Sequence, residues 1–313
     1  MHHTDTNSKQ PIKSKWYQTT SFQKRLFLFF AIVPTFGGYL LFDLYPNLMS
    51  VYYSLLDWDG ITTPTFVGIE NYIRMFQDEY VWRALLHNLF YMVTAPVLVI
   101  LISLILAYLL TNKGFKGTQT FKVLFFFPNV LSTVVVALLW AFIYDGSFGL
   151  LNAFIELFGI DMNDFYWLGD TRTALSAIVP PTVWAGVGLY IIIFMNAMLT
   201  IPKSLYESAI LEGASHKDRL TLITMPLIKP LIRVSAIFLV LGTLKTVDMV
   251  LILTRGGPAG STDIIGLYMF NLAFGEQVHN YGYASAIGMF LFVILVGVKL
   301  LVDKLLPDRS YEY

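Results

Sequence analysis

Long apolar runs separated by short polar segments dominate this chain, and the runs are long enough to cross a lipid bilayer. About 20 consecutive apolar residues span the hydrocarbon core of a membrane as a helix. The pattern therefore predicts an all-α polytopic membrane protein with six transmembrane helices. They are expected over residues 26–45, 87–110, 123–144, 174–199, 231–253 and 283–302.

Proline and glycine inside these runs predict where the helices depart from straight rods. Pro34 predicts a bend in the first span, and the Pro180-Pro181 pair predicts that the fourth span is broken or kinked. Gly288 and Gly297 are expected to be points of close helix packing in the sixth span.

One polar interruption, from Ser204 to Pro226, carries helix start and stop signals. Ser204 with Glu207 and Ser215 with Asp218 have the Ser-x-x-acid spacing of a capping box, so we expect a helix to begin at each serine. Gly213 suits the left-handed position that ends a helix, and Pro226 is expected to close the second helix. A short helix, a tight turn and another helix indicate a docking surface rather than a solvated loop.

Composition agrees with a membrane protein and excludes several classes of function. The chain has 56% hydrophobic residues, 13% charged residues and a mean hydropathy of +0.63. The formal net charge is zero, which gives no electrostatic attraction to nucleic acid. Cysteine is absent, and the sequence has no phosphate-binding loop motif and no His-based metal or catalytic motif. We therefore expect no enzyme active site, no metal and no cofactor in this chain.

The distribution of lysine and arginine predicts the orientation. Basic residues gather in the tail of residues 1–25, in the 111–122 and 200–233 loops and in the tail of residues 303–313. By the positive-inside rule, both termini and the loop of residues 203–226 are expected on the cytoplasmic side, and residues 26–302 form one membrane domain.

The polar interruption resembles the EAA loop of ABC importer permeases, whose pattern is E-A-A, three residues, G, nine residues and I-x-L-P. The matching positions here are Glu207, Ser208, Ala209, Gly213, Ile223, Met225 and Pro226. Ser208 and Met225 depart from the usual alanine and leucine, and Glu212 stands where aspartate usually precedes the glycine. The resemblance implies contact with an ATPase subunit through Glu207, Ser208, Ala209, Glu212, Gly213 and Ala214.

Residues 26–302 are more widely similar to the larger permease of carbohydrate ABC importers of the maltose and glycerol-3-phosphate type. The similarity includes the segments 57–60, 66–72, 127–130, 149–152, 167–170, 256–258 and 281–286. It implies a bacterial plasma-membrane complex with a second homologous permease, two ATPase subunits or domains that bind ATP and magnesium, and an extracytoplasmic solute-binding protein.

Two charges in the fifth span have two interpretations. Lys245 and Asp248 lie three residues apart on one helix face, and each costs about 2.5–3.5 kcal/mol at the bilayer centre. They are therefore expected to face the bundle interior or a wet cavity. They form either a structural ion pair or part of a solute path, which Thr243, Thr246 and Tyr190 would extend.

Two rival functions remain open from the sequence. A secondary sugar transporter driven by an ion gradient would use Lys245 and Asp248 as a relay, but it has no need for a docking loop. A structural scaffold or simple pore explains neither the intramembrane charges nor the expected break in the fourth span.

Overall fold

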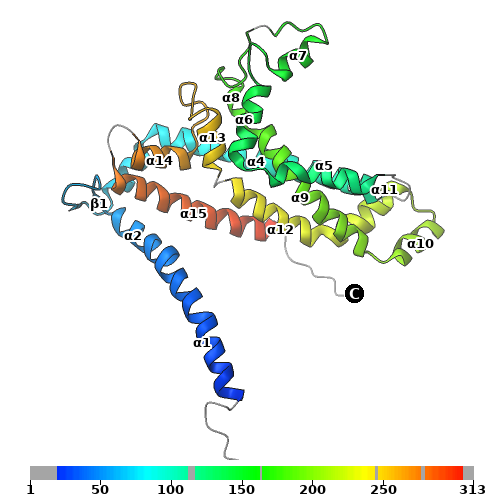
Figure 1. The fold of residues 1–313 in the computed structure, drawn as a ribbon, viewed down its shortest axis with the longest axis horizontal. Coiled ribbons are helices and arrows are strands. Elements are labelled where there is room, and N and C mark those ends of the chain that lie inside the picture. The colour runs from blue at the N-terminus through cyan, green and yellow to red at the C-terminus, as the bar shows by residue number, and fades with distance from the viewer. Residues whose placement is uncertain (1–19, 112–116, 163, 244–245, 276–278, 306–313) are drawn as a thin grey trace, which may run out of the picture. The chain divides into compact units, whose positions relative to one another are not determined.

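The computed structural model describes residues 20–111, 117–162, 164–243, 246–275 and 279–305, and these residues are mostly helical (Figure 1). They divide into two compact units, residues 1–52 and 53–313. Among the described residues, five helices are long and apolar enough to cross a membrane, or six when one sharply bent pair counts as a single span. The predicted fold class is confirmed.

The first unit consists of one long apolar helix. The α-helix α1 (Thr20–Tyr39), the π-helix η2 (Leu40–Leu44) and the α-helix α2 (Tyr45–Tyr53) follow one another without a break. The candidate span runs from Phe22 to Tyr53, so it extends beyond the predicted residues 26–45. The extension arises because apolar and aromatic residues continue to Tyr53 with Asp43 as the single charge between 26 and 53.

The second unit has its main core between α4 (Glu79–Thr111) and α9 (Val179–Thr200). The larger cluster of buried residues includes Tyr91 and Val99 of α4 and Ile191 and Phe194 of α9. A serine ties the two helices together, because the Ser103 hydroxyl donates to the carbonyl of Val187 at 3.0 Å.

The predicted third span is broken. The helices α5 (Thr118–Val130) and α6 (Thr133–Ile143) meet at a bend of 101° instead of forming one uninterrupted helix. Leu131 and Ser132 are extended, and Ser132 starts α6 by accepting a hydrogen bond from the Val135 N–H. Pro128, one turn earlier, cannot donate a backbone hydrogen bond, which favours the end of α5 at this point.

The fourth span is interrupted at one residue, just before the Pro180-Pro181 pair where we predicted a break, and it is not split into two spans. The helix α8 (Ala174–Ala177) leads through Ile178 into α9, and the two count as one candidate span from Ala174 to Thr200. Pro180 and Pro181 lie in the first turn of α9, where a missing N–H leaves no helical bond unmade.

The predicted fifth span is displaced toward the N-terminus. A continuous helix, which we call the arm, runs from His216 to Thr243 through α11 (His216–Asp218), the π-helix η3 (Arg219–Thr224) and α12 (Met225–Thr243). The arm ends at Thr243, and a separate short helix, α13 (Val247–Leu253), follows. The predicted end of the helix at Pro226 is therefore wrong. The wider π turn before this residue accommodates the proline ring, and the Met225 N–H donates to the carbonyl of Leu220.

Small elements gather at one end of the second unit, opposite α10 (Lys203–Leu211) (Figure 1). The strands β1 (Leu56–Asp57) and β2 (Thr65–Phe66) form an antiparallel pair, and the amphipathic helix α3 (Glu70–Gln77) follows them. The short apolar helix α14 (Ile265–Phe274), which the sequence did not predict, packs against α15. The helix α15 (Tyr281–Leu305) is the sixth predicted span, extended by a few residues.

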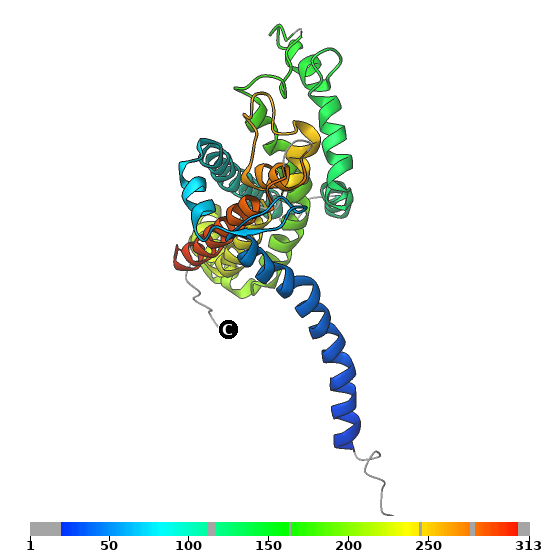
Figure 2. The same cartoon turned by 90° about the vertical axis from the view of Figure 1, so that its left-hand side faces the viewer.

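A lobe of residues 144–173 projects from the helical bundle of the second unit, and it contains α7 (Leu150–Glu156) (Figures 1 and 2). Asn152, which is 4% exposed, organises this lobe. Its amide donates to the carbonyls of Gly146, Met162 and Phe165, and its oxygen accepts from the Trp167 indole at 2.7 Å.

Candidate functional site

The docking segment predicted from the sequence forms a separate, exposed helix. α10 runs from Lys203 to Leu211, as expected for a short helix in this region. Its predicted cap is wrong, because the helix begins one residue before Ser204 and its N-cap position is Pro202, which makes no side-chain cap.

The turn after α10 is fixed by backbone hydrogen bonds. Gly213 has a φ of +83°, in the left-handed region that favours glycine, as predicted. The Ala214 N–H donates to the carbonyl of Ala209 at 2.9 Å, and the Gly213 N–H donates to that of Ile210 at 3.0 Å. This pair of bonds is the Schellman motif, which gives the end of α10 a defined direction.

The start of the arm is capped as the sequence predicts. Ser215 accepts a hydrogen bond from the Asp218 N–H at 3.2 Å, and the Asp218 carboxylate accepts one from the Ser215 N–H at 2.9 Å. A second contact joins α10 to the arm, since the hydroxyls of Tyr206 and Thr224 lie 2.9 Å apart. The helix, the turn and the arm therefore form one connected element.

The residues predicted to contact an ATPase subunit differ in how exposed they are. Glu207, Ser208, Glu212 and Gly213 are exposed, while Ala209 and Ala214 are half-buried. A Cβ atom added at Gly213 would meet no described atom beyond its chain neighbours within 4 Å. The apolar side chain of Leu211 on the same helix is 89% exposed.

Behind α10 lies a pocket of about 510 Å³ between this helix, the arm and the ends of α4 and α9. Its lining includes the charged residues Lys203, Glu207 and Arg219 and the imidazole of His216. Glu207 is therefore placed at the edge between the exposed surface of α10 and this charged pocket.

Three of the residues predicted to line a solute path, Thr243, Thr246 and Asp248, lie at the junction of the arm and α13. Thr243 is buried and its hydroxyl donates to the carbonyl of Val240, while the Thr246 hydroxyl donates to that of Gly242. Asp248, in the first turn of α13, is exposed within the described chain and does not lie in its interior, so the expected wet cavity stays a prediction. Lys245 lies outside the described residues.

Tyr190 belongs to a different part of the core, in α9. Its side chain is 8% exposed and its ring packs against that of Phe194, with 6.2 Å between the centroids. The sequence reasoning missed Tyr91, a buried residue of α4 whose hydroxyl contacts that of Thr182 in α9 and also interacts with Thr246. The polar residues Tyr91 and Thr182 inside otherwise apolar runs were the available signal.

The break between α5 and α6 is held against α9 by close backbone contact. A Cβ atom at Gly188 would lie 2.1 Å from the carbonyl oxygen of Phe125, so only glycine fits there. The Asn129 amide donates to the carbonyl of Ala185 at 3.2 Å. Farther along α6, the Trp140 indole N–H is buried without a hydrogen-bond partner among the described residues, and its ring meets that of Trp184 edge-on.

The carboxylate of Asp78, directly before α4, connects α14 and α15 at the end of the second unit opposite α10. Asp78 accepts hydrogen bonds from the hydroxyl of Tyr268 in α14 at 2.8 Å and from that of Tyr283 in α15 at 2.6 Å. Burial raises the pKa of Asp78, but the hydroxyl bonds from Tyr283 and Tyr268 outweigh it and leave the pKa below its ordinary value. The guanidinium of Arg74 lies 4.2 Å from the centroid of the Tyr283 ring.

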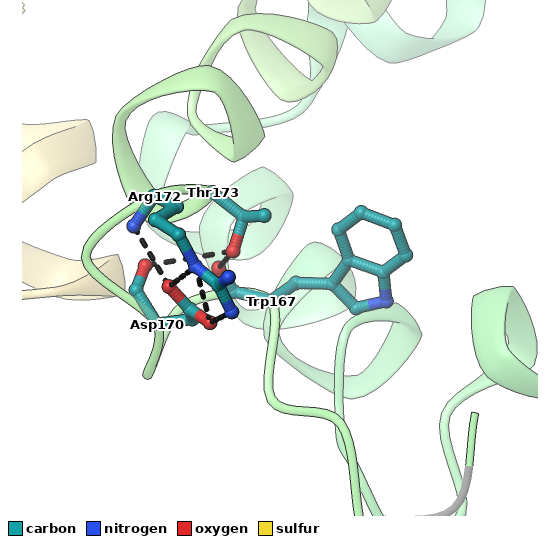
Figure 3. A network of polar contacts seen from close by, with 4 residues as sticks. All are labelled: Trp167, Asp170, Arg172 and Thr173. Atoms are coloured by element: carbon teal, nitrogen blue, oxygen red, sulfur yellow. Dashed lines mark hydrogen bonds and ion pairs between the residues drawn. The ribbon is translucent and has the colours of Figure 1, made fainter.

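The segment of residues 167–170 has a structural role at the base of the lobe (Figure 3). The Arg172 guanidinium donates to both carboxylate oxygens of Asp170, and this contact lowers the pKa of Asp170 to about 2. The Thr173 hydroxyl donates to the carbonyl of Trp167 at 2.8 Å, directly before α8 begins.

Comparison of the sequence with known proteins identifies the family to which the chain belongs. Residues 99–311 match the family described as binding-protein-dependent transport system inner membrane component. The chain is 32% identical over 287 residues to the diacetylchitobiose uptake system permease protein NgcF of Streptomyces coelicolor, covering 88% of this chain and 80% of NgcF. It is 33% identical over 284 residues to the multiple sugar-binding transport system permease protein MsmF of Streptococcus mutans, covering 90% and 95% of the two chains.

A solved structure has the same fold. It is a bacterial alginate ABC transporter in complex with an alginate pentasaccharide-bound periplasmic protein, and one chain of it matches with a TM-score of 0.77. The sequences are 21% identical, and the match covers 92% of this chain and 96% of that chain. The chain therefore belongs to the family of binding-protein-dependent transport system inner membrane components, which are permease subunits of ABC importers.

Proposed function

We propose that this chain is the permease of an ATP-driven carbohydrate importer and that it contacts an ATPase subunit through residues 203–226. The carbohydrate class rests on the names of NgcF and MsmF. The proposed partners are a second permease, two ATPase subunits or domains that carry ATP and magnesium, and an extracytoplasmic solute-binding protein. In the proposed orientation α10 and both termini face the cytoplasm of a bacterial cell.

The observation that carries the proposal is the construction of α10 and its turn. The Schellman bonds at Gly213, the capping box at Ser215 and the Tyr206–Thr224 contact hold the helix in a fixed direction relative to the arm. The exposed surface around Glu207 and Leu211 is left open. A rigid helix with an exposed surface is suited to bind a partner protein and to transmit the motion of that partner.

The arm connects α10 and its turn to the membrane-spanning part of the chain, so it can carry the motion of α10 into the membrane. It is a continuous helix of 28 residues, which corresponds to about 42 Å at 1.5 Å per residue. Movement of α10 is expected to shift the end of the arm at Thr243, next to Thr246 and Asp248. We propose that these residues, Lys245 and Tyr190 line the solute path, where polar groups can hydrogen-bond to sugar hydroxyls.

A bulky substitution in the turn tests the ATPase contact. Gly213→Trp places a large ring on the open surface, whereas Gly159→Trp makes the same change at a similar glycine in the lobe. Both glycines have positive φ, +83° and +79°, and open space where a Cβ would lie. Backbone strain is therefore comparable, and the position of the added ring is the main difference.

We expect Gly213→Trp to reach the membrane in normal amounts but to lose the ATPase subunit on purification, while Gly159→Trp retains it. Solute-stimulated ATP hydrolysis in liposomes provides a second readout. Normal co-purification and normal hydrolysis with Gly213→Trp would refute the proposed contact surface. Uptake that requires an ion gradient and no ATP would instead favour the secondary transporter.

A further inference from the structure

A half-buried ion pair joins the arm to the last span. The Arg233 guanidinium in α12 donates to a carboxylate oxygen of Asp303 in α15 at 2.8 Å, and the two side chains are 18% and 26% exposed. The second carboxylate oxygen of Asp303 lies 2.8 Å from the Lys299 ammonium, four residues earlier on α15 itself. Asp303 thus makes one contact between two helices and one within its own helix.

The other end of α15 is also held by a charge-assisted contact. Tyr283, 20 residues before Asp303, donates to Asp78, which accepts from Tyr268 of α14 as well. At 1.5 Å per residue the two attachment points are about 30 Å apart along the helix. α15 therefore links the arm to α4 and α14 at the opposite end of the unit.

We propose that the Arg233–Asp303 pair is a positioning contact that makes α15 follow the arm when the ATPase subunits move α10. The inference rests on the proposed function and names the point at which motion passes from the arm to a second span. An ion pair between two packed helices has a defined geometry, so translation of α12 displaces Asp303 and with it α15. Without the pair, α12 slides past α15 and ATP is hydrolysed with less solute moved.

The test compares the number of solute molecules moved per ATP in liposomes that hold the complete transporter. Asp303→Asn removes one charge of the pair with almost no change in side-chain volume, and Arg233→Gln removes the other charge with a shorter polar side chain. Lys299→Met is the matched control, because it removes the other partner of Asp303 without separating two helices. Arg233→Lys tests rescue by a second cation.

We expect Asp303→Asn and Arg233→Gln to lower the transport ratio by roughly fivefold or more, a typical magnitude for coupling between distant sites, with ATP hydrolysis maintained. The double variant should be no worse than the poorer single variant, because the two residues act as a unit. Lys299→Met should keep the wild-type ratio, and Arg233→Lys should recover part of it. A wild-type ratio in Asp303→Asn, or an equal loss in Lys299→Met, would overturn the inference.

A second measurement leaves the Arg233–Asp303 pair intact. It therefore tests the inference even if the variants of the pair fail to assemble. Spin labels at Phe238 of α12 and Val296 of α15, both exposed positions, report the separation of the two helices in the otherwise native complex. The distance distribution should be the same in the nucleotide-free and ATP-trapped states. A shift between the states would show that α12 and α15 move independently and would contradict the inference. If the wild-type complex itself shows no ATP-driven uptake, the proposed function fails instead.

Discussion

Removing the Tyr283 hydroxyl should destabilise the protein through Asp78, and the magnitude follows from the contact geometry. The hydroxyl donates to the carboxylate at 2.6 Å, and Tyr283 is 0% exposed. Hydrogen bonds to charged groups contribute about 1.5–3 kcal/mol. Because Asp78 is half-buried, we take the lower end, so Tyr283→Phe should cost about 1.5 kcal/mol, roughly a tenfold change in the folding equilibrium.

A double-mutant cycle with Asp78→Ala separates this contact from other effects. In the Asp78→Ala background the Tyr283 hydroxyl is buried without its acceptor, so Tyr283→Phe should cost nothing there or should stabilise the protein. The phenylalanine ring preserves the contact with the Arg74 guanidinium in both backgrounds. The control is Tyr80→Phe, since Tyr80 contacts Asp78 through its backbone N–H and not through its hydroxyl.

The assay is equilibrium unfolding of the detergent-solubilised protein with a denaturing detergent, followed by circular dichroism and tryptophan fluorescence. The stability that ionised Asp78 contributes is present above the pKa that it has in the unfolded chain, and it is lost as pH falls through its lower pKa in the folded protein. Because the Tyr283 hydroxyl helps to lower the folded pKa, Tyr283→Phe should also reduce the acid sensitivity of unfolding. Equal costs of Tyr283→Phe in the two backgrounds would refute the reasoning, because they would show that the hydroxyl and the carboxylate do not interact.

Three further predictions concern packing, capping and orientation. Gly188→Ala should sharply lower the yield of folded protein, because its Cβ would overlap the backbone of α5. Gly297 lies in open space and is not the point of close packing that the sequence predicts, so Gly297→Ala should be neutral or add up to about 1 kcal/mol of helix stability; size-exclusion profiles in detergent separate the two. Ser215→Ala should cost about 1 kcal/mol and speed trypsin cleavage at the start of the arm, while Ser204→Ala, which removes no cap, should not. Cysteines at Ser215 and Thr63 should react with an impermeant reagent from opposite sides of the membrane, and labelling from the same side would contradict the proposed orientation.

Hydropathy was sufficient to predict a helical membrane protein and to place the fourth and sixth spans within a few residues, because long apolar runs depend on the bilayer rather than on tertiary contacts. It did not place the fifth span, which lies at His216–Thr243, or the break in the third span. The turn at Gly213 and the cap at Ser215 were also predictable, since both depend on residues within one helical turn. These local signals explain why residues 203–226 could be identified from the sequence.

The departures from prediction have tertiary causes. The break at Ser132 was missed because apolar residues flank it on both sides, and the close fit at Gly188 that holds α5 in place is not visible in either segment alone. Pro226 was read as a helix end because a π turn that accommodates the proline has no clear local signal. The contacts of Asp78 and Arg233 join residues far apart in sequence, so hydropathy could not pair them.

The central claim is tested most directly by uptake into liposomes that contain this chain, its second permease and the ATPase subunits, with the solute-binding protein outside. Radiolabelled candidate carbohydrates are added outside, and ATP is enclosed inside. The account predicts accumulation of a carbohydrate that requires both internal ATP and the binding protein and that Gly213→Trp abolishes. Accumulation driven by a sodium or proton gradient without ATP would contradict it.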